Sequence, residues 1–169
     1  MTFAEFELLP ERESGRIELR NGEVVKSPPP KSKHVLIQHC LRNLLANAAG
    51  TAGIAGTEWA FRPSTGRDYR VADVAFAPTE QWARMDPDGY FDGAPGLAIE
   101  IALPEDLFGE LLEKEKLCLE NGAREFWIVD IEGRQVKVST PDGHTITYKS
   151  GQQIPLLFGG NMPVDSIFA

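Results

Sequence analysis

The sequence has little of what marks several common classes of protein. It contains only two cysteines, Cys40 and Cys118, and neither sits in a Cys-x-x-Cys or Cys/His spacing, so zinc and a disulfide framework are not indicated. We expect both to be reduced core residues. No stretch approaches the roughly 18 apolar residues of a membrane span. The first ten residues carry Glu5 and Glu7 rather than a basic and then an apolar segment, which argues against a secretory signal. We therefore expect a cytoplasmic protein.

Basic residues are also scarce. The chain has 17 Lys and Arg against 25 Asp and Glu, a formal net charge of −8, which is the wrong sign for holding nucleic acid by overall charge. A net negative charge of the whole chain still allows a local basic surface. Gly159-Gly160-Asn161 is not followed by Lys and Ser/Thr, so it is no phosphate-binding P-loop and no nucleotide cofactor is suggested. The three histidines, His34, His39 and His144, lack the spacing of metal ligands, and we expect His39 on the outer face of its helix.

The 169 residues suit one folded domain spanning 1–169, with an ordinary globular composition. Asn21-Gly22 separates two alternating runs within residues 17–25, which predicts a tight type I′ hairpin. After the Pro-rich joint 28–30, apolar residues recur at helical spacing, and Ser32 can cap a helix over Lys33–Ala49.

The rest of the chain alternates strand and helix patterns, which predicts an α+β domain with a mixed sheet. Runs of apolar and β-branched residues between Gly, Pro and Asp turns predict strands, and a charged stretch ending at Gly122 predicts a helix. The expected strands are 58–62, 70–77, 97–103, 126–129, 135–139 and 145–149, the charged helix is 104–121, and the apolar tail 155–168 should dock on the body.

Two acids interrupt otherwise apolar strands. Asp73 shares a strand face with Val71 and Ala75, and Glu100 lies on the small-residue face of its strand, opposite the large side chains. A buried ionised acid is costly unless a cation or hydrogen-bond donors compensate it. A hard divalent ion such as Mg²⁺ would do so, because it prefers one or two carboxylates plus water and phosphate oxygens. An equally available alternative pairs Glu100 with an Arg or Lys of a covering helix.

The helix after Glu100 can supply a cation. Lys114 lies in an i, i+4, i+7, i+11 row with Leu107, Leu111 and Cys118, so it can lean toward the sheet. A neighbouring row contains Glu115, and Lys116 lies toward the other edge. Spacing alone therefore does not choose among these charged residues, and on spacing a solvated Lys114 is the plainer alternative.

Taken together, these segments resemble the Uma-type family of restriction endonucleases, a branch of the PD-(D/E)xK nuclease superfamily. The resemblance covers nearly the whole chain, and the order and spacing of its segments are more specific than any segment alone. The segments are the opening hairpin 17–25 with Pro28-Pro29-Pro30, Arg70-Val71-Ala72-Asp73-Val74, Gly93-Ala94-Pro95-Gly96-Leu97-Ala98-Ile99-Glu100-Ile101, and Glu113-Lys114 through Gly122-Ala123-Arg124-Glu125-Phe126-Trp127-Ile128-Val129-Asp130.

The resemblance implies a restriction-endonuclease-like core, a mixed β-sheet flanked by helices with an N-terminal β-hairpin. It implies Asp73 and Glu100 as metal-binding acids, with the Ile101 carbonyl as a further ligand, Lys114 as the catalytic lysine supplied from the helix, and Glu18 as an auxiliary acid. Mg²⁺, replaceable by Mn²⁺, would be the cofactor, DNA the substrate and a homodimer the assembly. The chain departs from the family pattern at three positions: Ala72, Leu103 and Cys118 stand where the family favours Pro, Ser and Tyr.

The resulting hypothesis is metal-dependent hydrolysis of phosphodiester bonds by an endonuclease. The alternative from another class is a catalytically inactive nuclease-fold module for binding or assembly, which the acidic balance and the three departures favour. A third possibility, a hydrolase of sugars with a carboxylate pair, needs an acid and a base in different environments.

Overall fold

A six-stranded mixed β-sheet forms the centre of the protein, which we describe from a computed structural model covering residues 1–9, 16–103 and 108–169. The strand order is β3-β4-β5-β6-β7-β8; β5 and β6 run parallel and the other neighbours are antiparallel. The strands are β3 (Gly53–Phe61), β4 (Arg70–Pro78), β5 (Leu97–Ala102), β6 (Glu125–Asp130), β7 (Gln135–Ser139) and β8 (Thr145–Tyr148). The predicted α+β class with a mixed sheet is therefore confirmed, and each predicted strand is present, β3 beginning five residues earlier than expected.

The predicted N-terminal hairpin is present as a separate two-stranded sheet, β1 (Arg16–Arg20) and β2 (Glu23–Ser27). Asn21 and Gly22 both have positive φ, 48° and 86°, as a type I′ turn requires. The fully buried Leu19 exchanges backbone hydrogen bonds with Tyr69 just before β4, so the hairpin is fixed to the body beside that strand. A short helix, α1 (Phe3–Glu7), precedes it.

Helix α2 (Ser32–Ala49) covers one face of the sheet. Its apolar stripe packs on the large residues of β4, β5 and β6, among them Phe76, Ile99 and Trp127. The predicted cap is wrong by one position: Lys31 is the N-cap, with no side-chain hydrogen bond, and Ser32 is already the first helical residue. Lys31 itself has the extended dihedral angles of an N-cap residue, and water can satisfy the first backbone N–H groups of a helix in place of a side chain.

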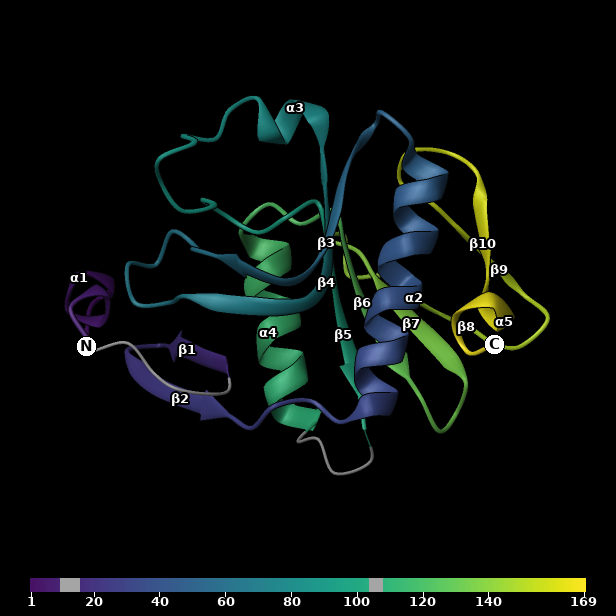
Figure 1. The fold of residues 1–169 in the computed structure, drawn as a ribbon, viewed down its shortest axis with the longest axis horizontal. Helices are drawn as coiled ribbons and strands as arrows, with labels where there is room; N and C mark the ends of the chain where they lie inside the picture. Colours follow the sequence, from purple (N-terminus) through teal and green to yellow (C-terminus); the bar gives the residue numbers. More distant parts are fainter. Residues whose placement is uncertain (10–15, 104–107) are drawn as a thin grey trace.

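Helix α4 (Phe108–Glu120) covers the opposite face (Figure 1). Here the sheet presents small residues, such as Ala75 and Ala98, and these lie in one buried cluster with Cys118. The predicted start of this helix, residues 104–107, lies outside the described residues. Because small side chains line this face of β4 and β5, room is left for the longer polar side chains that α4 and the hairpin direct toward it.

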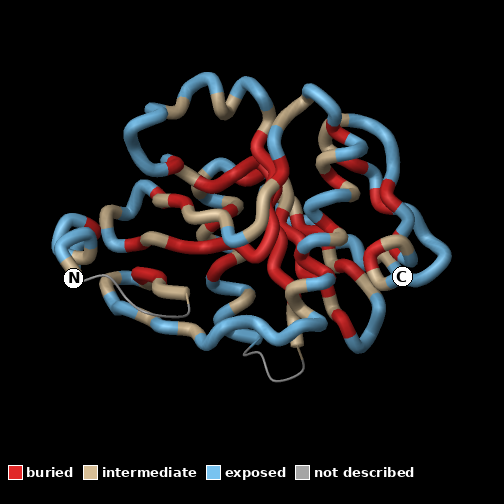
Figure 2. Tube along the Cα trace, in the orientation of Figure 1, coloured by how far each residue is buried: buried red, intermediate tan, exposed pale blue. Residues whose placement is uncertain are grey.

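The C-terminal tail docks on the α2 side as expected, through β9 (Gln153–Pro155), β10 (Asn161–Pro163) and α5 (Val164–Ile167). Ile154, Met162 and Ile167 are all buried against the core. Figure 2 shows the buried positions running along the central strands, with exposed positions on the outer sides of the helices and in the loops.

Among the described residues, no helix is both long and apolar enough to cross a membrane. A short helix, α3 (Thr79–Trp82), follows β4.

Candidate active site

Strands β4 and β5 separate at the two predicted acids. Their ladder pairs Val74 with Ile99 and continues toward Phe76, but it does not extend to Asp73 and Glu100. There the side chains replace it: Glu100 Oε2 accepts the Asp73 backbone N–H at 2.9 Å, and Asp73 Oδ2 accepts the Ile101 N–H at 2.8 Å. Each carboxylate thus bonds the backbone of the other strand, and this fork holds both acids, which are only 5% and 6% exposed, beside each other.

Lys114 reaches the fork from α4. Its ammonium donates to Glu100 Oε1 at 2.6 Å and to the Val71 carbonyl at 2.5 Å, and it lies 3.4 Å from Glu18 Oε1. Lys114 is buried, whereas Lys116 on the same helix is exposed. Of the placements that the spacing left open, the structure thus has Lys114 leaning onto the sheet. It also realises the alternative pairing, because the cation beside Glu100 comes from the covering helix.

Glu18 arrives from the hairpin and is fully buried. Besides Lys114, it accepts a hydrogen bond from Arg20 at 3.0 Å, and Arg16 Nη1 lies 3.6 Å from it. The four residues singled out in the sequence therefore converge from four elements of the chain: Glu18 from β1, Asp73 from β4, Glu100 from β5 and Lys114 from α4.

Arg16 is a member of the cluster that sequence reasoning missed. Its guanidinium lies 2.5 Å from Asp73 Oδ1, forks onto the carboxylate of Glu58, and donates to the Val71 carbonyl at 3.2 Å. It is the more exposed of the two cations, with 18% of its side chain accessible against 5% for Lys114. A signal was available: Arg16 lies two residues before Glu18, so it leaves the hairpin on the same face.

His34 and Gln38 were also missed. They lie four residues apart in the first turns of α2, so they project from one face, and Gln38 is buried. His34 Nε2 lies 3.3 Å from Asp73 Oδ2, and Gln38 Nε2 donates to the Asp73 carbonyl and to Glu58. Glu58 has φ 48° and sits opposite Asp73, where the β3–β4 ladder skips one pair. The sequence analysis gave His34 no role because it lacks the spacing of metal ligands, and its partner Asp73 is distant in the chain.

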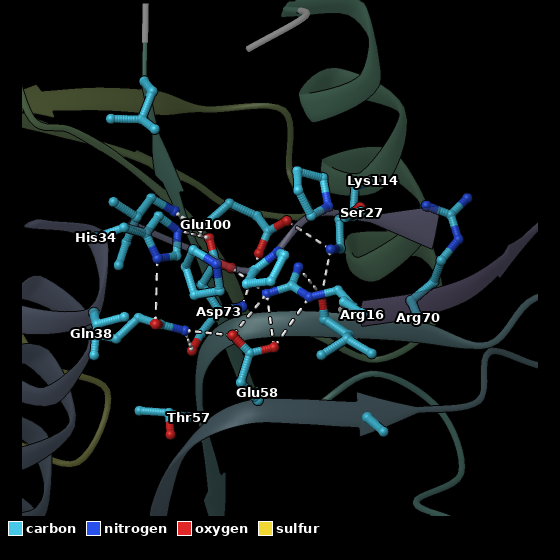
Figure 3. A pocket seen from close by; sticks show the side chains of 18 of the residues that line it. Arg16, Ser27, His34, Gln38, Thr57, Glu58, Arg70, Asp73, Glu100 and Lys114 are labelled. Atoms are coloured by element: carbon cyan, nitrogen blue, oxygen red, sulfur yellow. Dashed lines mark hydrogen bonds and ion pairs between the residues drawn. The ribbon is translucent and has the colours of Figure 1, made fainter. Parts of the chain in front are cut away.

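With the exception of the fully buried Glu18, these side chains line a cavity of about 900 Å³ (Figure 3). Its wall includes the Pro-rich joint 28–30, the start of α2 and the fork of β4 and β5. Five Lys or Arg residues line it against four Asp or Glu, and His34 and His39 are added to them. His39 is exposed at the rim, as expected of the outer face of α2. In a chain of net charge −8, the cavity is therefore a local region with no acidic excess.

The two carboxyl groups of the fork differ in their pKa. Burial would raise the pKa of Asp73, but the hydrogen bond from His34 and the charge of Arg16 outweigh burial and hold that pKa well below its usual range. Burial and the negative charge of Asp73 raise the pKa of Glu100 to about 7, despite the opposing pull of Lys114. Near neutral pH, Asp73 is therefore ionised and Glu100 is only partly so.

The pKa values of two basic groups beside the fork, Lys114 and His34, are raised. Burial alone would lower the pKa of Lys114, but the charges of Glu100 and Glu18 raise it above its usual value. Burial also opposes the protonation of His34, and the hydrogen bond and charge of Asp73 reverse that and raise its pKa.

A divalent cation fits the donor chemistry of this fork. The two neighbouring carboxylates repel each other when both are ionised, and an added positive charge would reduce that repulsion. Arg16 already places one cation against Asp73. As the side chains stand, no group of three or more His, Cys, Asp or Glu among the described residues is arranged to hold a metal ion. An ion such as Mg²⁺ does not need three, because water and phosphate oxygens complete its coordination.

The fold and the site together define a class: an α+β sheet with two acids at a strand fork and a lysine directed at them from the covering helix. The sequence profile of the Uma2 family, described as "Putative restriction endonuclease", matches residues 3–161. The chain belongs to this family, as its sequence motifs had indicated. A search of curated proteins found no match.

The fold is shared with a solved structure over its whole length. That structure is the crystal structure of a "putative nuclease belonging to DUF820" from Anabaena variabilis, with a TM-score of 0.86 and 22% sequence identity. The match covers 99% of this chain and 97% of that one. It therefore confirms the predicted nuclease-like architecture from the N-terminal hairpin to the C-terminal tail.

Proposed function

We propose that this protein is a metal-dependent endonuclease that hydrolyses phosphodiester bonds in DNA, with Mg²⁺ as its cofactor and Mn²⁺ as a substitute. The observation that carries the proposal is the fork itself. Asp73 and Glu100 lie side by side at the base of an open cavity, with the Lys114 ammonium 2.6 Å from one of them. Two acids and a lysine in contact are the parts that the PD-(D/E)xK type of nuclease uses, and membership of the Uma2 family supports the same reaction.

In the proposed mechanism, Asp73 and Glu100 would hold the ion, directly or through a water molecule, and the carbonyl of Ile101, the residue after Glu100, would be available as a further ligand. Bound Mg²⁺ would supply Lewis acidity toward a phosphate oxygen and toward a water molecule. Water adds to phosphorus, the bond from phosphorus to one sugar oxygen breaks, and that oxygen leaves as a hydroxyl after taking up a proton. Lys114 orients the water or stabilises the negative charge that develops on the phosphate.

Glu18 has a supporting role in this proposal. It lies 3.4 Å from the Lys114 ammonium, on the hairpin side, and Arg20 holds its second oxygen. A buried ammonium between two carboxylates keeps its position and its proton, so Glu18 fixes the lysine while Glu100 shares it. Glu18 thus acts as an auxiliary acid without having to contact the ion.

The nucleic-acid substrate is supported by the charge of the cavity wall, where five Lys or Arg residues meet four acids in an otherwise acidic chain. Local positive charge of this kind attracts phosphate groups even where the net charge of the protein opposes it. A homodimer is part of the proposal, because cutting both strands of a duplex is simplest with two active sites.

Supercoiled plasmid DNA tests the activity. The protein should nick it in Mg²⁺ or Mn²⁺ and not in EDTA, and Asp73→Asn should abolish both nicking and the rise in melting temperature on adding the metal. Asp88→Asn, in an exposed loop outside the cavity, is the matched control and should behave as the wild type. Absence of cleavage together with absence of metal-linked stabilisation would instead favour the inactive binding or assembly module.

A further inference from the structure

His34 is placed at the fork by two contacts, one from each ring nitrogen. Nε2 lies 3.3 Å from Asp73 Oδ2, and Nδ1 lies 3.3 Å from Gln38 Oε1 (Figure 3). The ring belongs to the wall of the cavity, and only 12% of the side chain is exposed. Both ring nitrogens are therefore positioned by the protein: Nδ1 faces Gln38, one turn further along α2, and Nε2 faces Asp73, an acid to which the proposed function assigns metal binding.

Gln38 fixes which ring nitrogen carries the proton. Its amide nitrogen donates to the Asp73 carbonyl at 3.0 Å and to Glu58 Oε1 at 2.9 Å. Both of those partners are acceptors only, so the amide cannot be turned round, and its oxygen must be the atom that faces His34. An oxygen in that place needs a donor, which makes Nδ1 the protonated nitrogen of His34.

The consequence appears at the other nitrogen. With the proton on Nδ1, the neutral ring presents the Nε2 lone pair to an oxygen of Asp73, which is also an acceptor. Two lone pairs facing each other at 3.3 Å repel, so the pair is stable only with a positive species between or beside them. That species is either a second proton on the ring or a metal ion bound by both atoms.

We propose that His34 is a metal ligand, binding through Nε2 the divalent ion that Asp73 holds; this rests on the function proposed above. Adjacent ligands of an octahedral ion with bonds of about 2.1 Å lie about 3 Å apart, close to the 3.3 Å between Nε2 and Asp73 Oδ2. A metal-binding histidine also normally donates its other N–H to an oxygen that sets the tautomer, which is the part Gln38 plays.

Two direct side-chain donors are enough for such an ion, because it keeps several water molecules. The proposal is thus compatible with the lack of any three-residue metal cluster among the described residues, with Glu100 acting through a coordinated water. A nitrogen donor also changes the choice of metal. Imidazole favours transition ions over Mg²⁺, so Mn²⁺ and Co²⁺ should bind more tightly than Mg²⁺ at this site.

The test uses the small number of histidines in the chain. His39 and His144 are both exposed, so the double variant His39→Gln/His144→Gln should fold normally and leaves His34 as the sole imidazole in tag-free protein. Bound Mn²⁺ in this variant should show electron spin echo modulation from a directly coordinated nitrogen, and labelling histidine with ¹⁵N should change its frequencies. The single variant His34→Gln should lose that modulation and bind Mn²⁺ about tenfold or more weakly by calorimetry.

A further variant tests the part assigned to the Gln38 oxygen. Gln38→Leu retains the imidazole but removes the oxygen that sets its tautomer, so the Mn²⁺ affinity should fall about tenfold while the nitrogen modulation weakens or disappears. Mn²⁺ bound in an Asp73-dependent way without any histidine nitrogen would overturn this inference and leave the proposed function standing. Failure of the wild type to bind Mn²⁺ at all would remove both.

Discussion

Replacing Glu100 with glutamine removes one charge from the centre of the fork and retains its shape. In the wild type, the carboxyl of Glu100 has a pKa of about 7 in the folded protein against an ordinary value of 4.5, chiefly because of burial and the nearby charge of Asp73. A carboxyl whose pKa is raised by folding binds its proton more tightly in the folded state. Its contribution to stability is thus complete below pH 4.5 and is lost as the pH rises through 7.

The size of that loss follows from the two pKa values. A rise from 4.5 to about 7 at about 1.36 kcal/mol per pKa unit gives roughly 3 kcal/mol between pH 4.5 and pH 8. Glutamine does not titrate, so Glu100→Gln should escape the loss. It also gives up a charge-assisted hydrogen bond from Lys114, worth about 1.5–3 kcal/mol, although Glu18 and the Val71 carbonyl still compensate that ammonium.

Urea unfolding in EDTA at pH 5 and pH 8 measures the difference. The free energy of unfolding of Glu100→Gln relative to the wild type should improve by about 2–3 kcal/mol between pH 5 and pH 8. Under the proposed function, saturating Mg²⁺ at pH 8 should then reverse the trend, because an ion held with the help of the Glu100 carboxylate would stabilise the wild type. A difference between the two proteins that does not change with pH would refute the claim that Glu100 holds its proton near neutrality.

Lys114→Met leaves Glu100 and Glu18 buried without their shared cation, so it should lower the free energy of unfolding, measured in urea at pH 8, by about 3–5 kcal/mol. Lys116 is exposed on the same helix, and Lys116→Met should stay within about 0.5 kcal/mol of the wild type. Equal effects of the two substitutions would contradict the buried placement of Lys114. Arg16→Met removes the cation that lies against Asp73 and should tighten Mn²⁺ binding at least about tenfold by calorimetry, given that opposite charges about 4 Å apart near a protein surface attract by as much as about 4 kcal/mol. Arg20, on the same strand, contacts Glu18 and Glu110 instead of Asp73, so Arg20→Met should change the Mn²⁺ affinity far less. An unchanged Mn²⁺ affinity for Arg16→Met would show that the Arg16 guanidinium does not compete with the ion.

The local patterns were enough to predict the fold because they were unambiguous. Asn21-Gly22 between alternating runs specifies its turn, and the large residues of β5 all fall on the face that α2 covers. The predicted cap of α2 was wrong because Ser32 is a common capping residue, whereas the helix begins one residue earlier, directly after the extended Lys31.

The site was predicted only in part, for a reason that also has a physical basis. Asp73 and Glu100 stand out because acids are costly in apolar strands, and family resemblance chose Lys114 where helical spacing left alternatives. Arg16 and His34 are ordinary in their own segments. Their importance comes from contacts with Asp73 across separations of 57 and 39 residues, and spacing rules for single elements do not reach that far.

The hairpin is a sheet of its own, yet it contributes Glu18, whose partner Lys114 lies 96 positions later in the chain. During synthesis on the ribosome, the first strands would therefore emerge long before the helix that completes the constellation. A shortened product ending before α4 would have both acids of the fork without the ammonium between Glu100 and Glu18. Under the function proposed above, hydrolysis would therefore begin only once α4 has been made and has folded onto the sheet.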